Sequence, residues 1–105
     1  MTAWHRLGSK DEILARVPFA EKIERHRIAV FLYEGRLTAI SDICNHKGGP
    51  LSEGRLHGEF VTCPWHGSQF RLSDGACMHG PATFPQLRLE ARLSNGMVEV
   101  RGREG

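Results

Sequence analysis

Four residues in two short segments carry side chains that readily bind a metal. Cys44 and His46 form a Cys-x-His pair, and Cys63 and His66 form a Cys-x-x-His pair further along the chain. Two thiolates and two imidazoles can bind either zinc or iron. Glycines and prolines lie in both segments, and they favour tight loops that could turn each cysteine and histidine toward one point. The spacing therefore predicts a metal site made of two loops.

The pairing of the ligands helps to distinguish the two metals. Structural zinc sites usually pair cysteine with cysteine and histidine with histidine, whereas each segment here contains one of each. Two mixed segments suit a two-iron cluster better, with the histidines on one iron and the cysteines on the other. A zinc-stabilised interaction module is the alternative from a different functional class.

The sequence around these residues resembles Rieske ferredoxins that serve bacterial oxygenases. Three segments carry the resemblance: Cys44–Leu51, Cys63–Phe70 and Asp74–Ala82. The resemblance implies one [2Fe-2S] cluster per chain, with Cys44, His46, Cys63 and His66 as the iron ligands. The residues expected to surround the cluster are Lys47, Gly48, Pro64, Trp65, Gly67, Ser68 and Phe70.

The resemblance also implies a function, that of a one-electron carrier rather than an enzyme. A flavin-dependent NAD(P)H reductase would supply the electron, and a terminal oxygenase would receive it. The small Rieske subunit of an assimilatory nitrite reductase, or of another redox complex, is the alternative within the same family.

Three positions differ from the Rieske proteins of respiratory cytochrome bc complexes. Those proteins have an additional cysteine in each ligand loop, and the two cysteines form a disulfide; the residues here are Gly49 and Trp65. Those proteins also have a tyrosine two residues after the serine of the second loop, where this chain has Phe70 after Ser68. The loop disulfide and that hydroxyl donor to the cluster are therefore missing, which favours the ferredoxin branch.

The composition bounds the remaining possibilities. The chain has 105 residues, enough for one core but not for a separate substrate domain, and its formal charge of +2 is too small to predict nucleic-acid binding. The longest apolar run, residues 28–33, is too short to span a membrane. Cys77 has no cysteine left to pair with inside the chain. This fits a reducing compartment, where disulfides are rare. We expect a cytoplasmic monomer without nucleic-acid or membrane partners.

Short β-strands must position the two loops. The β-branched and apolar runs predict strands at residues 27–33, 37–40 and 59–62. Alternating leucines and charged residues predict a strand over residues 87–93, which Asn95-Gly96 turns back into residues 97–101. Near the amino terminus, a strand at residues 3–7 and one helical turn after Ser9 are predicted.

These strands flank the ligand loops on both sides, which predicts an all-β fold in a single domain, residues 1–105. The resemblance implies a Rieske-like antiparallel sandwich or barrel. Its base would come from residues 1–41 and 86–105, and a small cluster-binding β-subdomain of about residues 42–85 would be inserted between them.

Overall fold

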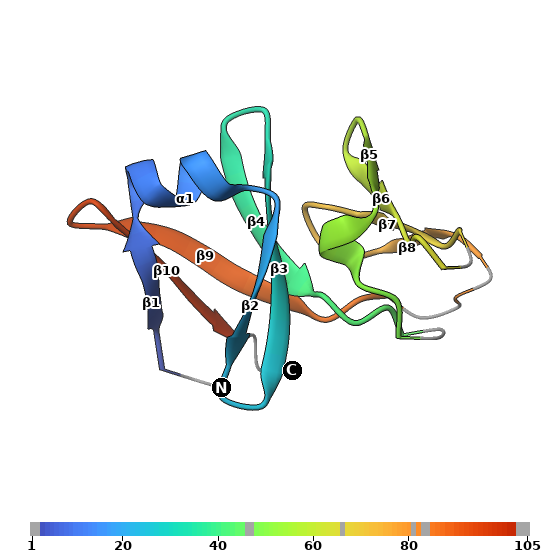
Figure 1. The fold of residues 1–105 in the computed structure, drawn as a ribbon, viewed down its shortest axis with the longest axis horizontal. Helices are drawn as coiled ribbons and strands as arrows, with labels where there is room; N and C mark the ends of the chain where they lie inside the picture. Colours follow the sequence, from blue (N-terminus) through green and yellow to red (C-terminus); the bar gives the residue numbers. More distant parts are fainter. Residues whose placement is uncertain (1–2, 46–47, 66, 81, 83–84, 103–105) are drawn as a thin grey trace.

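The computed structural model describes residues 3–45, 48–65, 67–80, 82 and 85–102. Within these residues the chain forms two antiparallel sheets of short strands (Figure 1). The helical elements are α1 (Lys10–Arg16) and the short 3-10 helix η1 (Leu51–Glu53). The predicted all-β fold is confirmed.

The larger sheet combines strands from both ends of the described chain. Its six strands lie in the order β1 (His5–Ser9), β10 (Met97–Gly102), β9 (Arg88–Ser94), β4 (Arg36–Ser41), β3 (His26–Tyr33) and β2 (Phe19–Ile23). β4 joins the two halves of the sheet, because it pairs with β3 along its length and with β9 through Ala39 and Ile40.

The smaller sheet lies at the other end of the molecule from α1 (Figure 1). Its four strands follow one another in chain order, and each is three residues long. They are β5 (Arg55–His57), β6 (Phe60–Thr62), β7 (Gln69–Arg71) and β8 (Cys77–His79).

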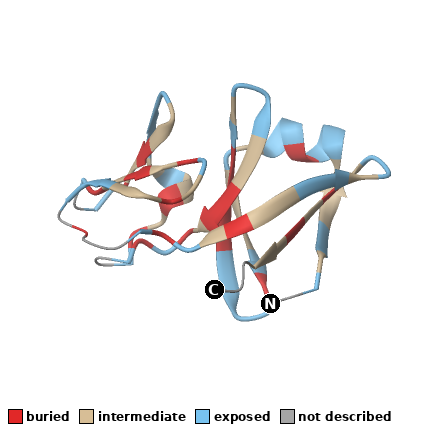
Figure 2. Cartoon of the chain, turned by 180° about the vertical axis from the view of Figure 1, so that it is seen from behind, coloured by how far each residue is buried: buried red, intermediate tan, exposed pale blue. Residues whose placement is uncertain are grey.

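The middle of β3 is buried (Figure 2), and its residues alternate between two apolar cores. Ile28 and Val30 pack inside the larger sheet with Ile13 of α1. Ala29 and Phe31 point the other way and pack against residues of the smaller sheet and its loops. The continuous apolar run of β3 follows from this position between two cores.

The helix begins where its sequence predicts but is longer than the single turn expected. The Ser9 hydroxyl accepts a hydrogen bond from the Glu12 N–H at 3.2 Å, which caps α1. The helix continues to Arg16 and ends before Pro18.

No helix of the described residues is long and apolar enough to cross a membrane.

The closing hairpin agrees with the sequence pattern in its strands and in its turn. Asn95 and Gly96 both have positive φ, as a two-residue turn of this kind requires. The predicted burial is only partly correct: Leu89 is buried, but Leu87, which precedes β9, and Leu93, near the end of β9, are 52% and 55% exposed.

Two strands were not expected from the sequence pattern. β2 contains Glu21 and Lys22, which interrupt its apolar pattern, and β8 has only three residues. β2 extends the hairpin of β3 and β4 into three strands, and β8 pairs with β7 at the edge of the smaller sheet.

Candidate metal centre

The first predicted ligand loop leaves the end of β4 and returns to η1. A bridge between Ile43 and Pro50 closes it. Inside this bridge, the Cys44 N–H donates to the Gly49 carbonyl at 2.9 Å, and the Gly48 N–H donates to the Cys44 carbonyl at 2.8 Å. These bonds fold the chain tightly on either side of the cysteine.

The second predicted ligand loop connects β6 and β7 and has the same hydrogen bonds. The Cys63 N–H donates to the Ser68 carbonyl at 2.8 Å, and the Gly67 N–H donates to the Cys63 carbonyl at 3.1 Å. Gly67 has φ +81° and Gly48, its counterpart in the first loop, has φ +83°. A residue with a side chain would be strained at either position. The two loops are therefore built on one backbone pattern.

The two cysteines meet in one apolar cluster. Cys44 and Cys63 are each 2% exposed and pack with buried residues such as Leu51 and Phe70. They form no disulfide. Two cysteine side chains on matching loops, once deprotonated to thiolates, are ligands that bind iron. The described residues therefore fit a metal cluster held between the loops.

Gly49 allows the loops to approach one another. A Cβ at this position would lie 2.8 Å from the Cys63 sulfur and 3.0 Å from Cγ of Trp65. The base of the Trp65 side chain thus covers Gly49, while the residue as a whole is 58% exposed. Trp65 both covers the junction of the loops and offers an apolar surface to solvent.

Three of the predicted site residues, His46, Lys47 and His66, lie outside the described residues. Among the residues that are described, no three cysteine, histidine, aspartate or glutamate side chains form a group that could hold a metal ion. The two histidines thus remain ligands predicted from the sequence. Of the other predicted neighbours, Ser68 and Phe70 are fully buried and Pro64 is exposed.

Ser68 connects the second loop to the segment that follows β8. Its hydroxyl accepts a hydrogen bond from the Ala82 N–H at 2.9 Å. The thiol of Cys77 donates to the Ala82 carbonyl at 3.0 Å. Cys77 therefore has a structural contact and packs partly buried against the core around the two loops, as free cysteines often do.

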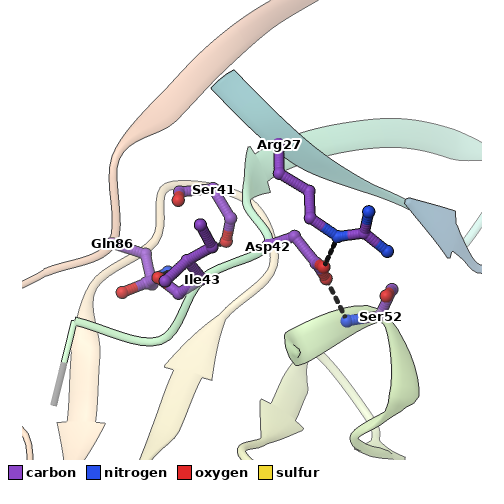
Figure 3. A network of polar contacts seen from close by, with 6 residues as sticks. All are labelled: Arg27, Ser41, Asp42, Ile43, Ser52 and Gln86. Atoms are coloured by element: carbon purple, nitrogen blue, oxygen red, sulfur yellow. Dashed lines mark hydrogen bonds and ion pairs between the residues drawn. The ribbon is translucent and has the colours of Figure 1, made fainter. Parts of the chain in front are cut away.

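Asp42 is a buried carboxylate beside the first loop that the sequence analysis missed. It accepts hydrogen bonds from Nε of Arg27 at 2.8 Å and from the Ser52 N–H at 2.7 Å (Figure 3). These bonds join β3, the end of β4 and η1, so they fix both ends of the loop. Gln86, also buried, is a second polar side chain beside the loop that the sequence did not predict.

An ion pair stabilises the turn between β7 and β8. Arg71 donates two hydrogen bonds to Asp74, at 3.0 and 2.8 Å, and the Ala76 N–H donates a third at 3.0 Å. The hydrogen bond from Arg71, together with that from Ala76, holds the pKa of the Asp74 carboxyl below its ordinary value.

The chain is similar along its length to ferredoxins of dioxygenase systems. It is 35% identical to the anthranilate 1,2-dioxygenase ferredoxin subunit of Burkholderia cepacia, over 95% of this chain and 93% of that protein. It is 41% identical to the 3-phenylpropionate/cinnamic acid dioxygenase ferredoxin subunit of Photorhabdus laumondii, over 70% of each chain.

Solved structures show the same fold. The ferredoxin of carbazole 1,9a-dioxygenase from Nocardioides aromaticivorans superposes with a TM-score of 0.86 at 23% identity, over 97% of this chain and all of that one. A ferredoxin in a complex of reduced oxygenase and oxidized ferredoxin of carbazole 1,9a-dioxygenase superposes with a TM-score of 0.84 at 26% identity, over 97% of this chain and 95% of that one. The model of the Rieske [2Fe-2S] domain matches residues 3–98, which include both loops, so this chain belongs to the Rieske [2Fe-2S] domain family and its cofactor is one [2Fe-2S] cluster.

Proposed function

We propose that this chain is the ferredoxin of a multicomponent oxygenase system and carries one electron without turning over a substrate itself. The observation that carries the proposal is the pair of matching loops, which bury Cys44 and Cys63 in one cluster without a disulfide. When bound, a [2Fe-2S] cluster accepts and releases a single electron. The relatives of similar length, which are ferredoxin subunits, support this role over that of an oxygenase.

The proposed ligands divide between the two irons by residue type. Cys44 and Cys63 would hold one iron, and His46 and His66 would hold the other. The burial of both cysteines supports their place on the inner iron. Residues beside the predicted histidine positions, such as Asn45 and Gly67, are exposed. This difference supports an outer iron through which a partner exchanges the electron.

The proposed partners are a flavin-dependent NAD(P)H reductase as the donor and a terminal oxygenase as the acceptor. A related ferredoxin forms a complex with its oxygenase in carbazole 1,9a-dioxygenase, which supports the acceptor. The three cysteines form no disulfide, which supports a reducing compartment such as the cytoplasm.

Anaerobic purification followed by metal and sulfide analysis tests the cofactor, and a reductive titration tests the carrier role. We expect iron and sulfide in equal amounts, visible absorbance, and the uptake of one electron per chain. Zinc in place of iron, with no visible colour, would contradict the proposal.

A reconstituted assay tests the partners. It uses the reductase and the oxygenase that we expect to be encoded beside the gene for this chain. NADH-dependent turnover by these two components should require the addition of this chain. Equal turnover without it would contradict the proposed partners while leaving the cofactor assignment intact.

A further inference from the structure

The buried amide of Gln86 makes three hydrogen bonds to the backbone around Cys44. Its Nε2 donates to the carbonyl oxygens of Ser41 and Ile43, each at 2.9 Å. Its Oε1 accepts from the N–H of Asn45 at 2.9 Å. The residue is 3% exposed, and Figure 3 shows it beside Ser41 and Ile43, on the segment that leads into β9. One side chain thus satisfies polar groups on both sides of a predicted ligand.

Two of these bonds hold the peptide groups that flank Cys44. The carbonyl of Ile43 belongs to the peptide before the cysteine, and the N–H of Asn45 belongs to the peptide after it. Each peptide group is planar, so holding both planes restricts the φ and ψ angles of the cysteine between them. The backbone angles set the direction of the Cα–Cβ bond, from which the thiol extends. The two hydrogen bonds from Gln86 therefore restrain this direction from outside the loop.

The backbone around Gln86 is itself held in place. Its N–H donates to the carbonyl of Gly75 at 2.7 Å, in the turn between β7 and β8. A Cβ on Gly75 would lie only 2.4 Å from the Gln86 carbonyl oxygen, so the two backbones are in close contact. On the other side, the Ser41 N–H donates to the Leu87 carbonyl at 2.8 Å. Backbone hydrogen bonds to both sheets thus hold the segment that carries the Gln86 side chain.

A second side chain strengthens the same connection in the opposite direction. Nδ2 of Asn45, in the first loop, donates to the carbonyl of Pro85 at 3.0 Å. Asn45 and Gln86 therefore each use their amide to bind the backbone of the other segment. This reciprocal pairing ties the first loop to the segment that leads into β9.

We propose that Gln86 is a positioning residue for the metal centre, which fixes the direction of the Cys44 thiol by holding the peptide groups on both sides of it. This inference rests on the proposed function, because it takes Cys44 as a ligand. Without the amide, two carbonyl groups and one N–H must find other partners, and the loop is free to adopt several arrangements. The position of the Cys44 ligand then differs between molecules, and the reduction potential differs with it.

Gln86→Met tests the proposal because it removes all three side-chain hydrogen bonds and nearly preserves the length and volume of the side chain. The measurements are made on anaerobically purified protein with its cluster. We expect hydrogen exchange of a peptide covering residues 41–45 to accelerate by about tenfold or more. We also expect broader lines in the EPR spectrum of the reduced protein and a shifted reduction potential.

Two further variants separate positioning from general stability. Val100→Ala removes two methyl groups from a fully buried site on β10, away from the loops, and lowers global stability without touching Cys44. It should leave the potential, the EPR line widths and the exchange of residues 41–45 as in the wild type. Gln86→Glu keeps the acceptor for Asn45 but replaces the donor with an oxygen that faces the Ser41 and Ile43 carbonyls, so its line widths should also exceed those of the wild type.

The outcomes distinguish this inference from the proposed function. Wild-type potential, line widths and loop exchange in Gln86→Met would overturn it, and so would the same changes in Val100→Ala. Loss of exchange protection in β3 and β4 in both Gln86 variants would also overturn it, because Gln86 would then support the fold rather than the ligand. Loss of the cluster with β3 and β4 still protected would support it. Wild-type protein without iron would instead refute the proposed function.

Discussion

At position 49 the first loop has no room for a side chain. The Cys63 sulfur and the Trp65 ring of the second loop occupy the place where a Cβ would lie, at 2.8 and 3.0 Å. The absence of a side chain is therefore what allows the two loops to bury their cysteines together. Glycine at this position has a packing role, in addition to removing the loop disulfide of the respiratory Rieske proteins.

Gly49→Ala should push the loops apart and reduce the cluster content of the purified protein. Overpacking of this kind costs about 1 to 3 kcal/mol of free energy. Because about 1.4 kcal/mol corresponds to a tenfold change, the equilibrium between bound and free cluster should shift by about tenfold. Iron and visible absorbance per chain are the measurements. Gly80→Ala is the control, because the nearest atom to its Cβ would be 3.7 Å away. Equal iron content in the two variants would refute the packing role.

Phe70 is a second residue whose type should affect the metal centre. It is fully buried in the apolar cluster that contains both cysteines. Phe70→Tyr adds a hydroxyl donor, and hydrogen bonds to the cluster sulfurs favour the reduced, more negative state. A hydrogen bond to a charged acceptor contributes about 1.5 to 3 kcal/mol, so the potential should rise by about 60 to 130 mV.

Protein-film voltammetry measures this shift, and Phe31→Tyr is its control. Phe31 is equally buried in the same cluster but is placed on β3 of the larger sheet. A rise of the same size in both variants would mean that the hydroxyl at position 70 acts only through a general change in the core.

The two cysteines proposed as ligands could be picked out from the sequence, and the polar residues that hold the first loop could not. Metal binding restricts which residue types occur and how they are spaced, so Cys44 and Cys63 are recognisable without a structure. Asp42 and Gln86 belong to types that usually lie at the surface. The partner of Gln86 in the first loop is 41 positions away in the chain, so its burial depends on the tertiary fold.

At the scale of elements, one buried carboxylate strengthens the connection between β3, the end of β4 and η1. Asp42 is fully buried, and its carboxylate accepts hydrogen bonds from Arg27 of β3 and from the backbone of η1, beside backbone hydrogen bonds of Asp42 to Arg27 and Leu51. A change there leaves buried donors without their charged acceptor. A second ion pair of the same length, Arg71 with Asp74, is more than one-third exposed on the carboxylate side. Because the nitrogen–oxygen distance is the same in the two pairs, comparing them tests how burial changes the contribution of an ion pair to stability.

Asp42→Asn should lower the free energy of unfolding by about 1 to 3 kcal/mol, because the amide places a donor opposite Arg27. Asp74→Asn should lower it by at most about 1 kcal/mol, since a partly exposed pair is screened by solvent. Urea unfolding of the anaerobically prepared proteins measures both changes. The larger loss in Asp74→Asn would contradict the role given to burial.

The contribution of Asp74 should also depend on pH. Arg71 lowers the pKa of this carboxyl in the folded protein, so its stabilising effect is present above the unfolded pKa, about 3.9. The effect is lost as the pH falls through the lower folded value. The difference in unfolding free energy between wild type and Asp74→Asn should therefore be constant above about pH 5 and decrease below about pH 4. A difference that grows on acidification would show the opposite sign.

Elements with a strong local pattern were predictable, and those that depend on neighbours were not. The hairpin of β9 and β10 follows from alternation and an Asn-Gly turn, and the start of α1 follows from Ser9 and Glu12. β2 and β8 show no such pattern. Each is a strand because an adjacent strand, β3 or β7, offers an edge to pair with.

At the scale of the whole molecule, the larger sheet provides a frame for a small sheet that carries the second loop. β3 supplies residues to both cores, and β4 leads directly into the first loop. The fold class was predictable because strands precede and follow the ligand segments. The side-by-side placement of β4 and β9, which brings Gln86 to the first loop, was not, because it joins segments about half the chain apart.

The central claim is that two cysteines and two histidines bind the cluster, and pulsed EPR of the reduced protein containing ¹⁵N-labelled histidine tests it most directly. We predict two strongly coupled nitrogens in the wild type, both from histidine. Replacing either His46 or His66 by cysteine should leave one, in whatever cluster survives. Two coupled nitrogens in either variant, or none in the wild type, would contradict this account of the site.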